Sequence, residues 1–221
     1  MDATVVILLL WLGFAATHIG LSSTPVRQFL VTRLGENPFR GVFSLIAFAF
    51  LIPLVWFYFT HKHAGPWLWV LPRGIPLLLV LYVGMAVAFV LFIASLVRPS
   101  PGSIVPGSAT PQGVQRITRH PLFMALALFG LLHMLPNGST ADIVFFGGFT
   151  LFSLVGGWHQ DQRKLAEAPT SYRQFYQRTP FLPFTGTATL QGLRELSPVI
   201  IAGGVLATLV VRHFHSAWFG G

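Results

Sequence analysis

Residues 115–138, QRITRHPLFMALALFGLLHMLPNG, decide how this chain is built, because two arginines and a histidine lead directly into an apolar stretch that holds a second histidine. Pro121 opens the apolar stretch, and proline suits the first turn of a helix, where the backbone donor that it lacks is not needed. The letters PNG that follow His133 by three residues predict a turn. The segment is therefore predicted to be a short apolar helix with titratable residues at its entrance and inside it.

The whole chain has the composition of a membrane protein. It has 221 residues, of which 53% are hydrophobic and only 9% are charged, and its mean hydropathy is +0.68. A bilayer core requires about 20 apolar residues per helical span. We predict one all-α domain over residues 1–221, a polytopic membrane helix bundle with about six transmembrane helices, at 3–24, 40–60, 76–97, 121–135, 142–158 and 196–214. The fourth and fifth share a tight turn and are predicted to form a helical hairpin.

The distribution of basic residues predicts an orientation. The formal net charge is +8, and 11 of the 14 lysines and arginines fall in the first, third and fifth loops. Because cytoplasmic loops carry the excess of basic residues, these loops are predicted to be cytoplasmic. The prediction is an integral membrane protein with both termini on the outer side, membrane lipid as its partner and no nucleic acid. The absence of cysteine excludes disulfides and thiolate ligands.

Two histidines fall inside predicted spans, where an ionisable side chain is costly and indicates a function. His18 lies about 13 Å from the cytoplasmic boundary and His133 about 21 Å, at 1.5 Å per helical residue. Two interpretations stay open: each imidazole bonds a carbonyl of a neighbouring helix, or both ligate one buried metal or haem iron. The second requires a tilted ligand axis, because the two depths differ by about 8 Å.

The entrance of the fourth span holds a second group. Arg119 and His120 precede the first helical turn, and the pair is interpreted either as a helix-start feature or as a site for a carboxylate or phosphate beside exposed amides. His159 ends the fifth span at a similar depth, which leaves a cytoplasmic histidine site as a further alternative. After it, the chain is predicted to continue as a charged helix, break near Pro169 and resume with aromatic residues at helical spacing along the membrane interface.

Four blocks of the sequence closely resemble the NnrU family, and they recur in the family's order over nearly the whole chain. They are HIGLSSTPVRQFLVTRLGENPFRGVFSL (18–45), RITRHPLFMALALFGLLHMLPNG (116–138), GGWHQDQRK (156–164) and RTPFLPF (178–184). The family includes membrane proteins linked to denitrification and the isomerases that act on 15-cis-zeta-carotene. The resemblance implies either haem-dependent cis–trans isomerisation of an apolar polyene or an accessory haem protein for nitrite and nitric oxide respiration. The segment LGENPFRG (34–41) looks more like the bacterial NnrU branch, which implies a bacterial inner membrane. The sequence names no protein partner.

The resemblance also implies a cofactor and its ligands. The isomerase branch holds haem b between two histidines, which correspond to His18 and His133 in this chain. The side chains that we consider for the haem propionates or for an acidic head group are Arg27, Arg40, Arg116, Arg119 and His120. The haem and its two histidine ligands come from the resemblance, the anion-binding side chains come from their residue types, and all of these assignments are expectations.

The chain departs from the isomerase pattern at one position. The isomerases have a cysteine three residues before the second histidine, and Gly130 stands there in this chain, so a thiolate switch is impossible. The TRHP block is also similar to the isoprenylcysteine carboxyl methyltransferase superfamily, which implies S-adenosylmethionine as an alternative cofactor. That superfamily has paired glutamates after the next span, whereas this chain has Asp161 alone.

Overall fold

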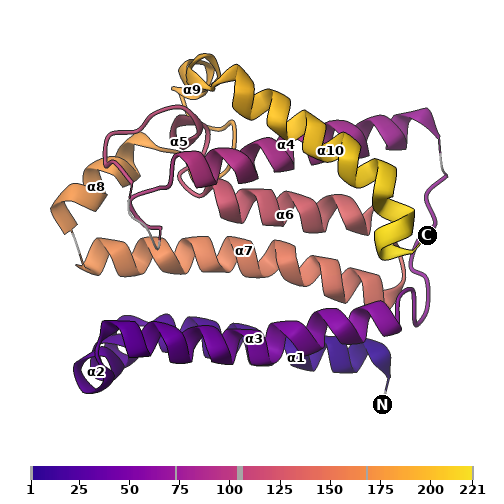
Figure 1. The fold of residues 1–221 in the computed structure, drawn as a ribbon, viewed down its shortest axis with the longest axis horizontal. Helices are drawn as coiled ribbons and strands as arrows, with labels where there is room; N and C mark the ends of the chain where they lie inside the picture. Colours follow the sequence, from indigo (N-terminus) through magenta and orange to yellow (C-terminus); the bar gives the residue numbers. More distant parts are fainter. Residues whose placement is uncertain (1, 73, 104–106, 168, 221) are drawn as a thin grey trace. The chain divides into compact units, whose positions relative to one another are not determined.

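The structure is a computed structural model that describes residues 2–72, 74–103, 107–167 and 169–220. Within these ranges the chain forms helices and no strand, with a single isolated bridge between Trp67 and Ser139 (Figure 1). The helices are α1 (Ala3–Ser22), α2 (Thr24–Leu34), α3 (Glu36–Thr60), α4 (Ile75–Val97), α5 (Val114–Ile117), α6 (Pro121–Met134), α7 (Thr140–Glu167), α8 (Pro169–Arg178), α9 (Thr189–Glu195) and α10 (Pro198–Phe219).

The predicted all-α membrane fold is confirmed. Five helices are long and apolar enough to cross a bilayer: α1, α3, α4, α7 and α10. The fourth predicted span becomes α6, which begins at Pro121 as expected but has only 14 residues. The chain is therefore an integral membrane protein with five full-length candidate spans and one shorter apolar helix in the described part of the chain.

Local sequence sets the helix boundaries. Asp2 caps α1, with its Oδ1 accepting from the backbone N–H of Thr4 at 2.7 Å, as an N-cap side chain does. Gly35 separates α2 from α3 at φ +88°, a backbone region that residues with a Cβ rarely adopt. Ser197 accepts from Val199 N at the start of α10, and Pro198 follows at the first helical position, where its fixed φ suits a helix.

The chain divides into two compact units, and the first comprises Met1–Leu71 with His133–Gly148. In this unit α1 packs closely on α3 at Gly13. A Cβ at this position would overlap the ring of Phe50, so the absence of a side chain permits the contact. The indole Nε1 of Trp11 donates to the carbonyl of Phe145 at 3.1 Å. That hydrogen bond sets the level at which α1 meets the first turns of α7.

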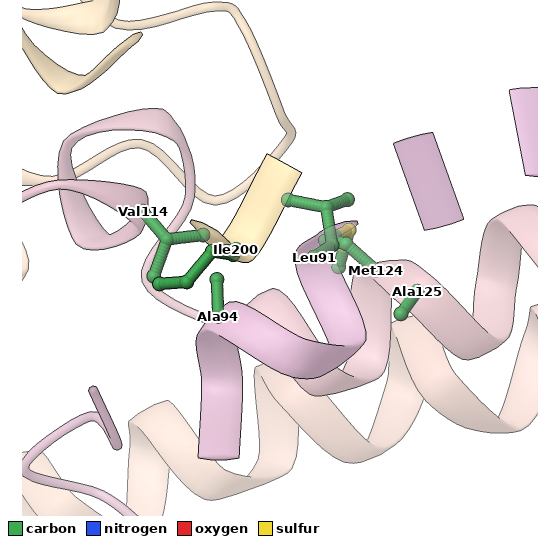
Figure 2. Packing of buried hydrophobic residues seen from close by; sticks show 6 residues of the cluster. All are labelled: Leu91, Ala94, Val114, Met124, Ala125 and Ile200. Carbon is green, nitrogen blue, oxygen red and sulfur yellow. The ribbon is translucent and has the colours of Figure 1, made fainter. Parts of the chain in front are cut away.

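The second unit comprises Pro72–Leu132 with Phe149–Gly221. Its core gathers buried apolar side chains from α4, α5, α6 and α10 (Figure 2): Leu91, Ala94, Val114, Met124, Ala125 and Ile200. Helices α4 and α10 approach closely at Gly204, where a Cβ would overlap Val90. Small residues permit this approach of membrane helices. The prediction of one domain over 1–221 stays a prediction.

The long helices expose large apolar side chains, which fits contact with lipid. Ile75 and Val199 are 73% and 78% exposed. The predicted break near Pro169 includes residue 168, which lies outside the described residues. From Pro169 on, α8 turns its aromatic side chains inward, in contrast to the predicted interfacial position: Tyr172 and Phe175 are buried, while Arg173 is exposed. The aromatic residues of α8 therefore contribute to the second unit.

Candidate functional site

His18 lies on α1 among aromatic rings. Its imidazole centroid is 4.5 Å from the ring centroid of Phe43 on α3 and 5.2 Å from that of Phe14. Its Nδ1 atom is buried. The side chain therefore presents a nitrogen donor in apolar surroundings, which is the environment expected for an intramembrane metal ligand or a buried neutral imidazole.

Two of the predicted anion-binding arginines share one carboxylate in the same unit. Arg27 Nη2 lies 2.6 Å from Glu36 Oε1, and Arg40 Nε donates to the same oxygen at 3.0 Å. The Arg27 guanidinium also lies over the ring of Phe39, 5.7 Å from its centroid, and Phe39 contacts Phe43 at 6.0 Å. A line of aromatic rings thus leads from Arg27 toward the ring that contacts His18.

His133 is the penultimate residue of α6 and belongs to the same unit as His18. Its ring stacks on Phe146 of α7 with centroids 4.8 Å apart. Asn137 Nδ2 donates to the His133 carbonyl at 2.8 Å and closes the end of the helix. Both histidines are therefore placed against phenylalanine rings.

The depths of the two histidines differ along the helix axes. Trp11 bonds the carbonyl of Phe145, one residue before Phe146, which stacks on His133. His18 lies seven residues beyond Trp11, which is about 10 Å along a helix. The offset is close to the 8 Å estimated from the sequence. Two imidazoles against aromatic rings are the donor type and the surroundings that would hold a haem iron.

A buried carboxylate that the sequence analysis missed lies in the first unit. Asp142 is fully buried near the start of α7, and its Oδ1 accepts from the Tyr58 hydroxyl at 2.9 Å. Its Oδ2 accepts from the Ser139 hydroxyl at 2.7 Å and lies 2.8 Å from Nδ1 of His63. The Tyr58 ring in turn stacks on Phe145 at 3.8 Å. This cluster fixes the α6–α7 hairpin that carries His133.

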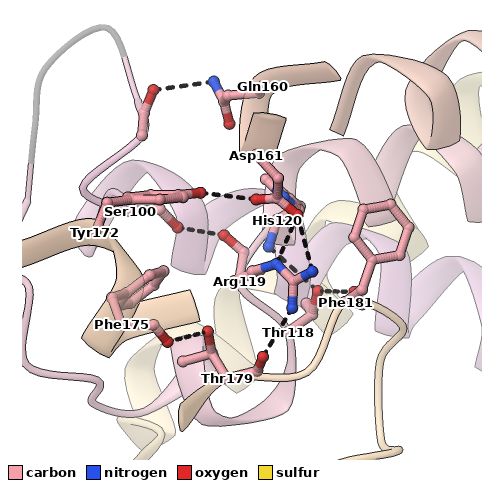
Figure 3. Close-up of polar contacts among 11 residues, drawn as sticks. Ser100, Thr118, Arg119, His120, Gln160, Asp161, Tyr172, Phe175, Thr179 and Phe181 are labelled. Carbon is pink, nitrogen blue, oxygen red and sulfur yellow. Dashed lines mark hydrogen bonds and ion pairs between the residues drawn. The ribbon is translucent and has the colours of Figure 1, made fainter. Parts of the chain in front are cut away.

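The second unit contains the other predicted anion-binding pair, Arg119 and His120, and both are buried (Figure 3). Arg119 Nε and Nη2 each lie 2.8 Å from Oδ2 of Asp161 on α7. His120 Nε2 lies 2.8 Å from Oδ1 of the same carboxylate. The anion that these two side chains bind in the structure is therefore a carboxylate of the chain itself.

Further contacts complete this buried group. The Tyr172 hydroxyl of α8 donates to Asp161 Oδ1 at 2.8 Å, and burial, followed by the charge of Asp161, raises the pKa of Tyr172 above its ordinary value. Arg119 Nη1 donates to the Thr179 carbonyl at 2.8 Å, and its guanidinium lies 4.2 Å from the centroid of Tyr176. The group ties the entrance of α6 to α7, to α8 and to the segment after α8.

The last predicted arginine also has an acidic partner. Arg116 Nε donates to Glu195 Oε2 at 3.0 Å, and the backbone N–H of Gly113 donates to the same oxygen at 2.7 Å. The hydrogen bond from Gly113 and that from Arg116 hold the pKa of Glu195 below its ordinary value. This pair attaches α9 to α5.

The scarcity of acidic residues in this chain could have drawn attention to Asp161 and Asp142. The chain has only 6 acidic residues against 14 basic ones, and these two lie on a helix apolar enough to span a bilayer. A carboxylate in such a helix requires partners, and each aspartate has several. Among the described residues no group of three or more histidines, aspartates and glutamates is placed to hold a metal ion.

The sequence comparison decides the family. The family model described as NnrU protein matches residues 6–221. The chain belongs to the NnrU family. That match includes every one of the predicted site residues, from His18 on α1 to His133 on α6.

Two curated relatives of this NnrU chain are named 15-cis-zeta-carotene isomerase, chloroplastic. The protein from Zea mays is 25% identical over 200 residues, which cover 87% of this chain and 52% of the relative. The protein from Arabidopsis thaliana is 28% identical over 193 residues, which cover 81% of this chain and 49% of the relative. The NnrU chain thus spans about half the length of these relatives. No solved structure was found to match it.

Proposed function

We propose that this NnrU-family protein is a haem b-dependent isomerase of a cis-polyene, with His18 and His133 as the iron ligands. The observation that carries the proposal is that two intramembrane imidazoles from α1 and α6 belong to one compact unit, each against phenylalanine rings. The similarity to curated isomerases supports the same reaction class.

The chain's own residues would hold and enclose the cofactor. His18 and His133 would supply one imidazole nitrogen each, and the rings of Phe43 and Phe146 pack against these imidazoles. When bound, haem b supplies a redox-active iron whose potential depends on its axial ligands and on the polarity around them. His18 and His133 would hold the group from α1 and α6, and the neutral imidazole is a common ligand of haem iron.

An apolar polyene suits the surface of the protein. The long helices expose large apolar side chains such as Leu45 and Leu151, which are 72% and 67% exposed. A substrate dissolved in the bilayer therefore meets the protein along its helices, without crossing water. Rotation about one double bond leaves the composition and the overall redox state of the polyene unchanged.

The proposal is tested in two steps. The purified protein, expressed with adequate haem, should show a Soret band that shifts on reduction. Coexpression with the enzymes that make a cis-carotene should then change the isomer profile of the extracted pigment, measured by chromatography. A protein without a Soret band would contradict haem binding. An unchanged isomer profile with haem intact would contradict isomerisation.

A further inference from the structure

A small cavity lies in the second unit where α4 ends and α9 leads into α10. Its volume is about 100 Å³, and its wall is mostly apolar, with Ala94, Val114 and Ile200 from the core shown in Figure 2 among its lining residues. Pockets for drug-sized ligands are about 300–1,000 Å³, so a polyene does not fit. The space suits a compact group, such as a phosphate with its first carbon atoms.

The cavity also holds one guanidinium whose charge the chain leaves uncompensated. Arg98 lines it, is exposed, and donates to Gln112 Oε1. In the described part of the chain, Arg98 has no acidic partner, because all six acidic side chains are engaged elsewhere. Glu195 lines the same cavity but is neutralised by Arg116. The site therefore favours an anion at Arg98.

Helix α9, beside the cavity, exposes apolar side chains on one face. Leu190 and Leu193 are 60% and 43% exposed, and at a spacing of three residues they share one face of the helix. At Gly192 the helix packs closely against the segment that leads into α5, because a Cβ there would lie 2.7 Å from the Gly113 carbonyl oxygen. The two leucines of α9 therefore lie just before α10, which is long and apolar enough to cross a bilayer.

We infer that this corner of the second unit binds an anionic phospholipid, with the phosphate on Arg98 and an acyl chain along the exposed face of α9. A guanidinium forms strong, charge-assisted hydrogen bonds with phosphate. Val97 and Leu196 line the same cavity as Arg98, and Val97, which is 59% exposed, supplies apolar surface beside that charge. This site is independent of His18 and His133 and does not rest on the isomerase proposal.

Binding is measured by native mass spectrometry of the purified full chain in detergent, titrated with phosphatidylglycerol, phosphatidylcholine or inorganic phosphate. Arg98→Gln should weaken the binding of phosphatidylglycerol about tenfold. The matched control is Arg173→Gln, an exposed arginine of α8 outside the cavity, which should bind as the wild type does. An equal loss of phosphatidylglycerol binding in Arg98→Gln and Arg173→Gln would overturn the inference. Binding of inorganic phosphate as strong as that of phosphatidylglycerol would also overturn it.

A second measurement tests where α9 lies. Because the chain has no cysteine, Leu193→Cys and the exposed Gln174→Cys of α8 each give a unique site for a spin label in lipid vesicles that contain phosphatidylglycerol. The label at 193 should be more accessible to oxygen than to a water-soluble nickel chelate, and the label at 174 should show the reverse. Equal preference for the nickel chelate at both sites would overturn the inference.

Discussion

The imidazole Nε2 of His120 lies 2.8 Å from Oδ1 of Asp161, while the neighbouring Arg119 bonds the other oxygen of that carboxylate. All three side chains are buried. A buried ion pair contributes little net stability when intact, but removal of one partner leaves a charge without compensation. The carboxylate is therefore the residue of this group whose loss matters most.

We expect Asp161→Asn to destabilise the protein by about 3–5 kcal/mol, because the amide cannot neutralise Arg119. Tyr172→Phe should cost less, about 1–3 kcal/mol, since it removes one hydrogen bond and no charge. Chemical unfolding in detergent, followed by circular dichroism, measures both free energies. The exposed Arg173→Gln is the control with no expected change, and equal costs for all three variants would contradict the assignment.

The ligand assignment makes a spectral prediction. His18→Ala and His133→Ala should each leave a five-coordinate, high-spin haem or apoprotein, because each removes one axial imidazole. His120→Ala should keep the low-spin spectrum, since its ring bonds Asp161. Absorption and electron paramagnetic resonance spectra of the purified variants measure the change. Loss of the spectrum in His120→Ala with retention in His133→Ala would place the iron elsewhere.

Tyr58 offers a separate test of the hairpin that carries His133. Tyr58→Phe keeps the ring that stacks on Phe145 and removes the hydroxyl that donates to Asp142. We expect a loss of about 1 kcal/mol in unfolding free energy. Asp142→Ala should cost more, because it removes the acceptor of Tyr58, Ser139 and His63 together. Thermal unfolding in detergent ranks the two variants, and the reverse order would contradict this role of the carboxylate.

The attachment of α9 should depend on pH. Because the folded state lowers the pKa of Glu195, its contribution to stability is present above the ordinary pKa of 4.5 and is lost as pH falls through the lowered value. Glu195→Gln should therefore be less stable than the wild type at pH 7, and the difference should shrink in acid. Thermal unfolding of the wild type and of Glu195→Gln at several pH values measures this stability difference. A difference that stays constant with pH would contradict the role of the Glu195 carboxylate.

The distribution of basic residues predicts the orientation of the helices. Reporter fusions after residue 221 and within 60–65 should report the outer side, and fusions within 98–115 should report the cytoplasm. The expected result follows from 11 basic residues on one side and 3 on the other. A cytoplasmic signal from the fusion after residue 221 would reverse the assignment.

Apolar runs made the long helices predictable, because a span needs continuous hydrophobicity and little else. The start of α6 at Pro121 followed from proline's preference for a first turn. Helix α2 was not predicted as a separate element, because Gly35 divides a stretch that lacks a clear apolar period. The pairing of His120 with Asp161 joins residues 41 positions apart, and no local pattern encodes such a contact. Polar residues within apolar spans indicated where sites lie, but their interaction partners could be identified only from the fold.

The length of α6 has a consequence for access to His133. Fourteen residues rise about 21 Å, about 9 Å less than the core of a typical bilayer. Such a hydrophobic mismatch is accommodated either by local thinning of the bilayer or by placing the turn between α6 and α7 below the membrane surface. The backbone of the turn tolerates that depth because Leu68 N donates to the Gly138 carbonyl and Thr140 N to that of Pro66. Small water-soluble reductants and gases therefore have a shorter route to His133 than to a residue at the middle of a full-length span.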